Sequence, residues 1–151
     1  LDRELPGWLA TIDPVNAPAL KNAENLRARE YLTRRLRLLE AAKSAATRFD
    51  NVDVIATPTV MFTPHVLTEE TGPDKFWARN RNTVHNLVPA NYLTLCAATL
   101  PVGLDRLGMP VGLQLIGKGG DDERLVSIAC AAERVLGTPR EILGTPPMCS
   151  G

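Results

Sequence analysis

The longest regular pattern of apolar residues in the chain runs from residue 19 to residue 48. Within it, apolar side chains recur at spacings of three and four, which places them on one stripe of an α-helix. Arginines occupy the flanks of this stripe, so the pattern predicts a long helix with a basic face. The apolar stripe consists of Ala28, Leu32, Leu36, Leu39, Ala42, Ala46 and Phe49.

A short β-branched run at residues 52–56 follows the predicted helix. The turn-forming pair Asp50-Asn51 precedes it and Pro58 ends it, so we expect a buried strand there. A long helix, a tight turn and a buried strand form the α-to-β half of an α/β unit, in which the helix lies against a sheet. The pattern therefore predicts an α/β fold.

The middle of the chain predicts a helix and a hairpin. Residues 61–74 are rich in turn-forming residues and should form a loop, whereas residues 75–96 show helical spacing, with an interruption at Pro89. The apolar segments 97–104 and 111–116 flank a turn, which predicts a β-hairpin. Its strands contain Gly103 and Gly112, and a glycine inside a strand commonly marks a bulge or a close backbone approach.

A last helix is expected at residues 121–137. Three acidic residues open it, where negative charge is favourable, and Gly137 ends it. Its predicted buried stripe consists of Leu125, Ile128, Ala129, Ala132, Val135 and Leu136.

The length of 151 residues and the apolar share of 44% permit one domain with a buried core. We divide the chain into a loop-rich lead-in at residues 1–18, a main portion at 19–137 and a Pro-rich tail at 138–151. The first residue is Leu1 rather than methionine. We therefore expect that this chain was cut from a longer protein.

The charge balance argues against two classes of partner. Seventeen basic and seventeen acidic residues cancel, which removes a global argument for nucleic-acid or anionic-membrane binding. No apolar run approaches the roughly 18 residues of a membrane helix. Residues 21–48 carry a local basic excess, which leaves nucleic-acid binding open as an alternative, but interleaved aromatic residues are missing. The odd number of widely spaced cysteines indicates a reducing, cytoplasmic compartment.

The sequence offers no complete catalytic group. Its serines, Ser44, Ser127 and Ser150, lie in predicted helices or at the end of the chain, without the sharp turn that exposes a nucleophile. Cys96 and His85 form a weak candidate dyad, because Cys96 lies in an apolar run and should be buried. His65 and His85 lack acidic neighbours at ligand spacing. We therefore expect no metal and no cofactor.

The glycines of GKGGDDE, after Ile116, suggest comparison with a phosphate-binding loop. The acidic residues that follow would repel a phosphate at the helix end that should attract it. We interpret the segment as a strand-to-helix turn with an acidic cap.

Two segments resemble the amidase-signature family: DVIATPT at residues 53–59 and NYLTLCAATLPVGLDRLGMPVGLQLIG at residues 91–117. The second is the more specific, with an asparagine, a Pro-Val-Gly strand, a turn and a Pro-x-Gly-x-Gln strand in the family's order. It departs from the common pattern at Thr94 and Cys96, where many members have glycine and proline. The resemblance implies the C-terminal part of an α/β/α sandwich around a mixed β-sheet.

The resemblance also implies a function, hydrolysis of a carboxylic amide bond by a serine, a cis-serine and a lysine. No residue of this chain matches that motif, so we expect the chain alone to be inactive. By analogy, Thr57, Pro58 and Thr59 should line the substrate pocket. The implied partners are a small-molecule amide, the missing N-terminal portion of the same protein and a second copy in a homodimer. The alternative is a non-catalytic binding or assembly module that reuses this half-fold.

Overall fold

The computed structural model describes residues 4–16, 25–64 and 73–145. The chain divides into two units, Leu1–Arg37 and Leu38–Gly151. The first contains the 3₁₀-helix η1 (Trp8–Thr11) and the start of helix α2 (Ala28–Ala46). The second contains the sheet and the remaining helices, and all cavities discussed below belong to it.

Helix α2 confirms the predicted long helix but begins later than expected. Residues 19–24 lie outside the described part of the chain, and residues 25–27 are not helical. The 3₁₀-helix η2 (Thr47–Phe49) continues α2 at its end. No residue of α2 is buried, and the stripe residues Leu32 and Leu36 are 55% and 60% exposed. The apolar stripe is therefore present but uncovered.

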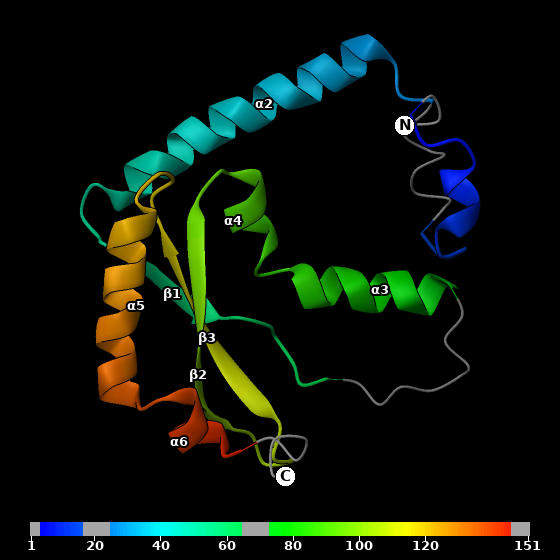
Figure 1. Cartoon of the computed structure of the whole chain (residues 1–151). Coiled ribbons are helices and arrows are strands. Elements are labelled where there is room, and N and C mark those ends of the chain that lie inside the picture. Colours follow the sequence, from blue (N-terminus) through cyan, green and yellow to red (C-terminus); the bar gives the residue numbers. More distant parts are fainter. Residues whose placement is uncertain (1–3, 17–24, 65–72, 146–151) are drawn as a thin grey trace. The chain divides into compact units, whose positions relative to one another are not determined.

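Three strands form one antiparallel sheet in the order β1-β3-β2 (Figure 1). They are β1 (Ile55–Pro58), β2 (Cys96–Leu104) and β3 (Pro110–Gly117). The β2-β3 hairpin confirms the prediction. Its register shifts between Pro101 and Gly103, which is the irregularity that a glycine in a strand indicated.

The prediction for the first strand was wrong in position and in burial. The strand is Ile55–Pro58 rather than residues 52–56, and three of its four residues are exposed. The physical reason is its place in the sheet, because β1 pairs only with β3 among the described strands and so forms an edge. Val54 still packs against the core from just before the strand.

The predicted helix at 75–96 is two helices, α3 (Pro73–Val84) and α4 (Val88–Tyr92). Pro73 and Asp74 thus belong to a helix and not to the predicted loop. The break precedes Pro89 because a proline in the first helical turn has no N–H that the helix would need. Cys96 lies in β2, so the helical segment ends at Tyr92, earlier than predicted.

Helices α5 (Asp122–Leu136) and α6 (Pro139–Leu143) complete the described chain. The core joins α5 to the hairpin through Cys96, Leu115, Leu125 and Ala129. The predicted stripe of α5 is correct up to Ala132 and wrong at its end, where Val135 is 87% exposed. Among the described residues, no helix is long and apolar enough to cross a membrane.

Candidate functional site

The sheet has two different faces, and helix α5 covers one of them (Figure 1). Leu113 and Leu115 of β3 pack with the core on that side. Because successive strand residues point to opposite faces, Gln114 lies on the other face. Its register partners are Thr57 on β1 and Thr99 on β2. We refer to Gln114, Thr57 and Thr99 as the polar row.

Gln114 is the most deeply buried side chain of the polar row, with an exposed fraction of 0%. Its Nε2 donates a hydrogen bond to the carbonyl oxygen of Asn86 over 3.1 Å. Within the described residues, neither its Oε1 nor the buried hydroxyl of Thr57 has a hydrogen-bond partner. Buried polar groups are normally paired, so two unpaired atoms on adjacent strands mark this as an unusual place in the fold.

Asn86 lies between α3 and α4 and connects this segment to the sheet. Its Nδ2 donates to the carbonyl oxygen of Pro58 over 2.8 Å, while its own carbonyl accepts from Gln114. One residue therefore contacts both the edge strand β1 and the central strand β3. The position of Thr57 between these two contacts depends on Asn86.

The segment after β1 remains attached to β3 beyond the strand. The N–H of Thr59 donates to the carbonyl oxygen of Gly112 over 2.9 Å, and its hydroxyl lies 3.4 Å from the hydroxyl of Thr99. A Cβ atom at Gly112 would lie 2.6 Å from Oγ1 of Thr59. This close approach confirms the role expected for a glycine inside the second hairpin strand.

A cavity of about 320 Å³, which we call the main cavity, lies beside the polar row, with Thr57 in its wall. Most of the wall is apolar, and Ile55 and Ile116, which are cross-strand partners, contribute to it. Polar groups come from Arg48, His85 and Asn86, together with Thr57. The other lining residues are Ala45, Phe49, Pro89, Leu93 and Leu95. An apolar cavity with a few convergent polar groups is typical of a small-molecule site.

A family model described as Amidase matches residues 10–126. The chain belongs to the amidase family. This confirms the resemblance stated from residues 53–59 and 91–117. The match also includes every residue that lines the main cavity.

Curated relatives of this amidase chain are longer than the chain itself. It is 36% identical over 148 residues to 2-amino-5-chloromuconic acid deaminase of Comamonas testosteroni, which covers 98% of this chain and 32% of that protein. It is 47% identical over 77 residues to a Glutamyl-tRNA(Gln) amidotransferase subunit of Methanothermobacter thermautotrophicus, covering 51% and 16%. The chain thus spans about a third or less of the length of these relatives.

Solved structures agree on the fold. A crystal structure of an amidase matches with a TM-score of 0.70 and 23% identity, over 90% of this chain and 31% of that one. The structure of 6-aminohexanoate cyclic dimer hydrolase matches with a TM-score of 0.70 and 21% identity, over 83% and 28%. The amidase-signature fold predicted from the sequence is therefore confirmed, and the described strands of this chain contribute an antiparallel part of it.

The three predicted site residues of the amidase chain do not share one cavity. Thr57 and Pro58 belong to β1 rather than to a turn after it, so strand alternation directs them to opposite faces. Thr57 lines the main cavity, Pro58 lines a separate cavity of about 260 Å³, and Thr59 lines neither. Their expected role in substrate binding stays a prediction.

Sequence reasoning missed four residues of this site. Arg48 was treated only as part of a basic face, His85 was considered only beside Cys96, and Asn86 was not noticed. Gln114 had a signal, because it is the glutamine of the Pro-x-Gly-x-Gln strand in the resemblance. Its burial could not be read from that motif, since it depends on which strand lies next to β3.

The groups considered for covalent chemistry are placed away from the main cavity. Cys96 is 8% exposed, and its thiol donates to the carbonyl oxygen of Lys118 over 3.0 Å. Burial, assisted by the carboxylate of Asp122, raises the pKa of this thiol above its ordinary value. Cys96 is therefore a protonated, buried residue, as expected. Ser44 and Ser127 lie in helices, while Ser150 and His65 lie outside the described residues.

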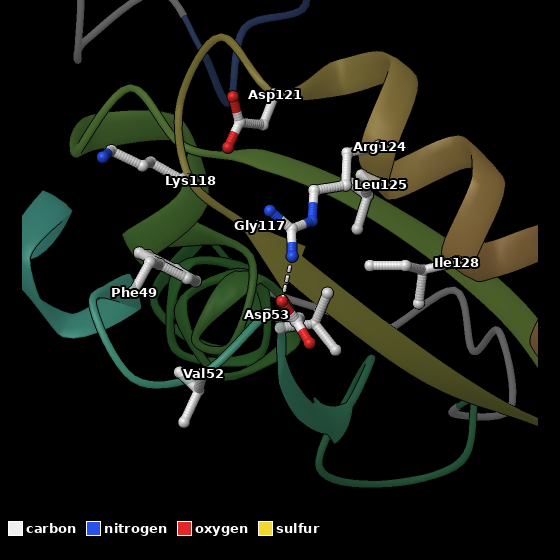
Figure 2. A pocket seen from close by; sticks show the side chains of 10 residues that line it. Phe49, Val52, Asp53, Gly117, Lys118, Asp121, Arg124, Leu125 and Ile128 are labelled. Carbon is white, nitrogen blue, oxygen red and sulfur yellow. Dashed lines mark hydrogen bonds and ion pairs between the residues drawn. The ribbon is translucent and has the colours of Figure 1, made fainter.

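A second, smaller cavity of about 40 Å³ lies at the start of α5 (Figure 2). The guanidinium of Arg124 points to the carboxylate of Asp53 across it and forms an ion pair. Both side chains are more than 60% exposed, so this pair contributes little to stability. The volume is close to that of a water molecule and excludes an organic substrate.

Proposed function

We propose that this chain is part of an amide hydrolase and that it forms one wall of the pocket for a small-molecule amide substrate. The observation that carries the proposal is the pair of unpaired buried atoms, Gln114 Oε1 and Thr57 Oγ1, beside the main cavity. An unsatisfied buried polar group costs about 1–3 kcal/mol, so its retention favours a functional reason over a purely structural one.

The reaction we propose for the complete protein is hydrolysis of a carboxylic amide. Water adds across the C–N bond, the acyl carbon receives the hydroxyl, and the amine leaves with a proton. The resemblance assigns this chemistry to a serine, a cis-serine and a lysine. We propose that they lie outside these 151 residues, because neither Ser44 nor Ser127 lies at an exposed turn. No cofactor is required for this reaction type.

Within the wall, we propose distinct roles for the three predicted residues. Thr57 contacts the substrate directly, since its side chain lines the main cavity. Pro58 acts through its carbonyl oxygen, which fixes β1 to Asn86. Thr59 positions the segment after the strand through its hydrogen bond to Gly112.

The names of relatives support a small substrate. The relative that matches along nearly the whole chain is named for its action on 2-amino-5-chloromuconic acid, a small molecule. The Glutamyl-tRNA(Gln) amidotransferase relative matches only about half of this chain. We therefore propose a small-molecule substrate rather than a nucleic acid. The rest of the same protein is the main partner, with a homodimer as a further proposal.

The test is a comparison of the complete protein with the 151-residue chain in an assay of ammonia release from small amides. We expect turnover by the complete protein and none by the chain alone. A complete protein whose upstream nucleophilic serine is replaced by alanine serves as the inactive control. Turnover by the purified chain alone would contradict the proposed division of labour, and inactivity of the complete protein toward all amides would contradict the function.

The second candidate is a non-catalytic binding or assembly module. The observation that favours it is the exposed apolar stripe of α2, where Leu32, Leu36 and Leu39 are 46–60% exposed. Exposed apolar stripes commonly mark contact surfaces. Stable association of the chain with another protein, together with inactivity of the complete protein, would favour this candidate.

A further inference from the structure

The main cavity has positively chargeable groups in its wall and no carboxylate. Arg48 and His85 line it, and none of the described residues around it is Asp or Glu. The ion pairs among the described residues involve other arginines, Arg34 and Arg124, so within that part of the chain Arg48 has no carboxylate partner. A guanidinium stays protonated at any physiological pH. The main cavity therefore has one permanent positive charge that its own wall does not neutralise.

The remainder of the wall limits the size and polarity of what can bind. The volume of about 320 Å³ is at the lower end of the range of roughly 300–1,000 Å³ for small-molecule pockets. Ile55, Ile116 and Leu95 give it an apolar surface that suits a short hydrocarbon segment. A short molecule with an apolar middle and an anionic end satisfies both parts of the wall.

We propose that the main cavity selects substrates that carry a free carboxylate, and that Arg48 is the specificity-determining residue that pairs with it. The inference rests on the function proposed above and names the substrate class of that same site, a short amide with an anionic end. The planar fork of a guanidinium matches a carboxylate with two parallel hydrogen bonds. His85 lines the same cavity and offers a second donor to the carboxylate.

Arg48 is well placed for this role because the local backbone holds it at the cavity. It belongs to the 3₁₀-helix η2, which directly follows α2. The hydroxyl of Thr47 donates to the carbonyl oxygen of Ser44 over 2.8 Å and fixes this transition. The adjacent Phe49 also lines the cavity, so the apolar and charged parts of the wall come from neighbouring residues.

The kinetic test uses the complete protein and two amides of similar length, succinamate, which has a carboxylate, and butyramide, which has none. We expect Arg48→Gln to raise KM for succinamate at least about fivefold and to leave KM for butyramide unchanged. Arg48→Lys keeps the charge but not the fork and should be intermediate. Arg134→Gln, an exposed arginine in the last turn of α5 outside the main cavity, is the matched control and should change neither KM.

A binding test separates this inference from the proposed function. Succinate is titrated into the complete protein and into the Arg48→Gln variant by calorimetry, with inorganic phosphate as the competing anion. Binding of succinate that Arg48→Gln weakens supports the inference, even if neither amide is hydrolysed and the proposed function fails. Equal effects of the variant on succinamate and butyramide, no binding of succinate, or equal affinity for phosphate would each overturn it while leaving amide hydrolysis intact.

Discussion

The side-chain Nδ2 of Asn86 donates a hydrogen bond to the carbonyl oxygen of Pro58, 2.8 Å away, and so attaches the edge strand β1 to the segment between α3 and α4. Edge strands lack a second neighbour, and β1 is only four residues long. A contact from outside the ladder is therefore important for its position. Through this bond, Asn86 also controls where Thr57 lies in the wall of the main cavity.

The first prediction concerns this bond. Asn86→Ala removes the Nδ2 donor but keeps the backbone carbonyl that accepts from Gln114. We expect a loss of about 1 kcal/mol in the free energy of unfolding, with faster amide hydrogen exchange in β1 than in β2. Urea denaturation at low protein concentration measures the first effect. Asn51→Ala, at an exposed loop position, is the control, and equal midpoints for both variants would contradict the prediction.

Gln114 leads to a second prediction, because its side chain is fully buried with one unpaired oxygen. Gln114→Leu removes that oxygen but also the donor to Asn86, so we expect a change within about 1 kcal/mol. Gln114→Glu instead buries a carboxylate and should cost about 3 kcal/mol or more at neutral pH.

The pH dependence of the Gln114→Glu variant has a definite sign. Burial raises the pKa of a carboxyl group, so the folded state favours the protonated form. The destabilisation should therefore be small at acidic pH and should grow as the pH rises above the ordinary range of a glutamate. Urea midpoints at several pH values measure it, with Gln114→Leu as the uncharged control. A cost for Gln114→Glu that is the same at all pH values would contradict the assignment of a buried site.

The sequence predicted the local elements of this fold better than their assembly. The β2-β3 hairpin was predictable because two apolar runs flank a turn, and both strand glycines had the expected roles. The ends of β1 were missed because its pairing with β3 joins residues 55–58 to residues 113–116, far along the chain. The burial of Gln114 was missed for the same reason. Long-range neighbours decide which polar residue of a strand becomes buried.

The third prediction concerns Thr94, whose φ of 53° makes it the non-glycine residue with positive φ among those described. This conformation costs a residue with a Cβ about 1 kcal/mol or more, and glycine adopts it freely. The family pattern often has glycine near this position. We therefore expect Thr94→Gly to stabilise the chain by about 1 kcal/mol, although the hydroxyl contact to Leu93 is lost.

A matched variant tests the explanation for Thr94. Thr83 lies inside helix α3, and its hydroxyl also donates to a backbone carbonyl, that of Arg79. Thr83→Gly should destabilise the chain, because glycine in a helix interior is unfavourable. Opposite signs for the two Thr→Gly changes in urea denaturation are the expected result. Destabilisation by both would show that the backbone conformation of Thr94 is not strained.

The fourth prediction concerns the exposed stripe of α2. Leu32, Leu36 and Leu39 would bind a hydrophobic dye or promote self-association of the isolated 151-residue chain. Replacing Leu32 and Leu36 by glutamine should lower dye fluorescence while the far-UV circular dichroism stays unchanged, because glutamine is also a good helix former. Val126→Gln and Val135→Gln, exposed positions on α5, are the control. A dye-silent, monomeric wild-type chain would contradict this prediction.

The last prediction uses the capping box at the start of α6. The backbone N–H and the hydroxyl of Thr138 donate to the carboxylate of Glu141 over 2.7 and 2.9 Å, and these bonds lower the pKa of Glu141 below its ordinary value of 4.5. Since the pKa is lower in the folded state, the stabilising contribution is present above pH 4.5 and is lost as the pH falls through the folded-state value.

The measurement for Glu141 is an NMR titration of its carboxyl carbon and of the Thr138 amide proton. In the wild-type chain both signals should titrate together below pH 4.5, because one proton event breaks both hydrogen bonds. Thr138→Ala removes the hydroxyl donor and should move the midpoint back toward the ordinary value. Glu133, an acidic residue of α5, is the internal reference. A Glu141 midpoint that Thr138→Ala leaves in place would show that the Thr138 hydroxyl does not contribute to the cap.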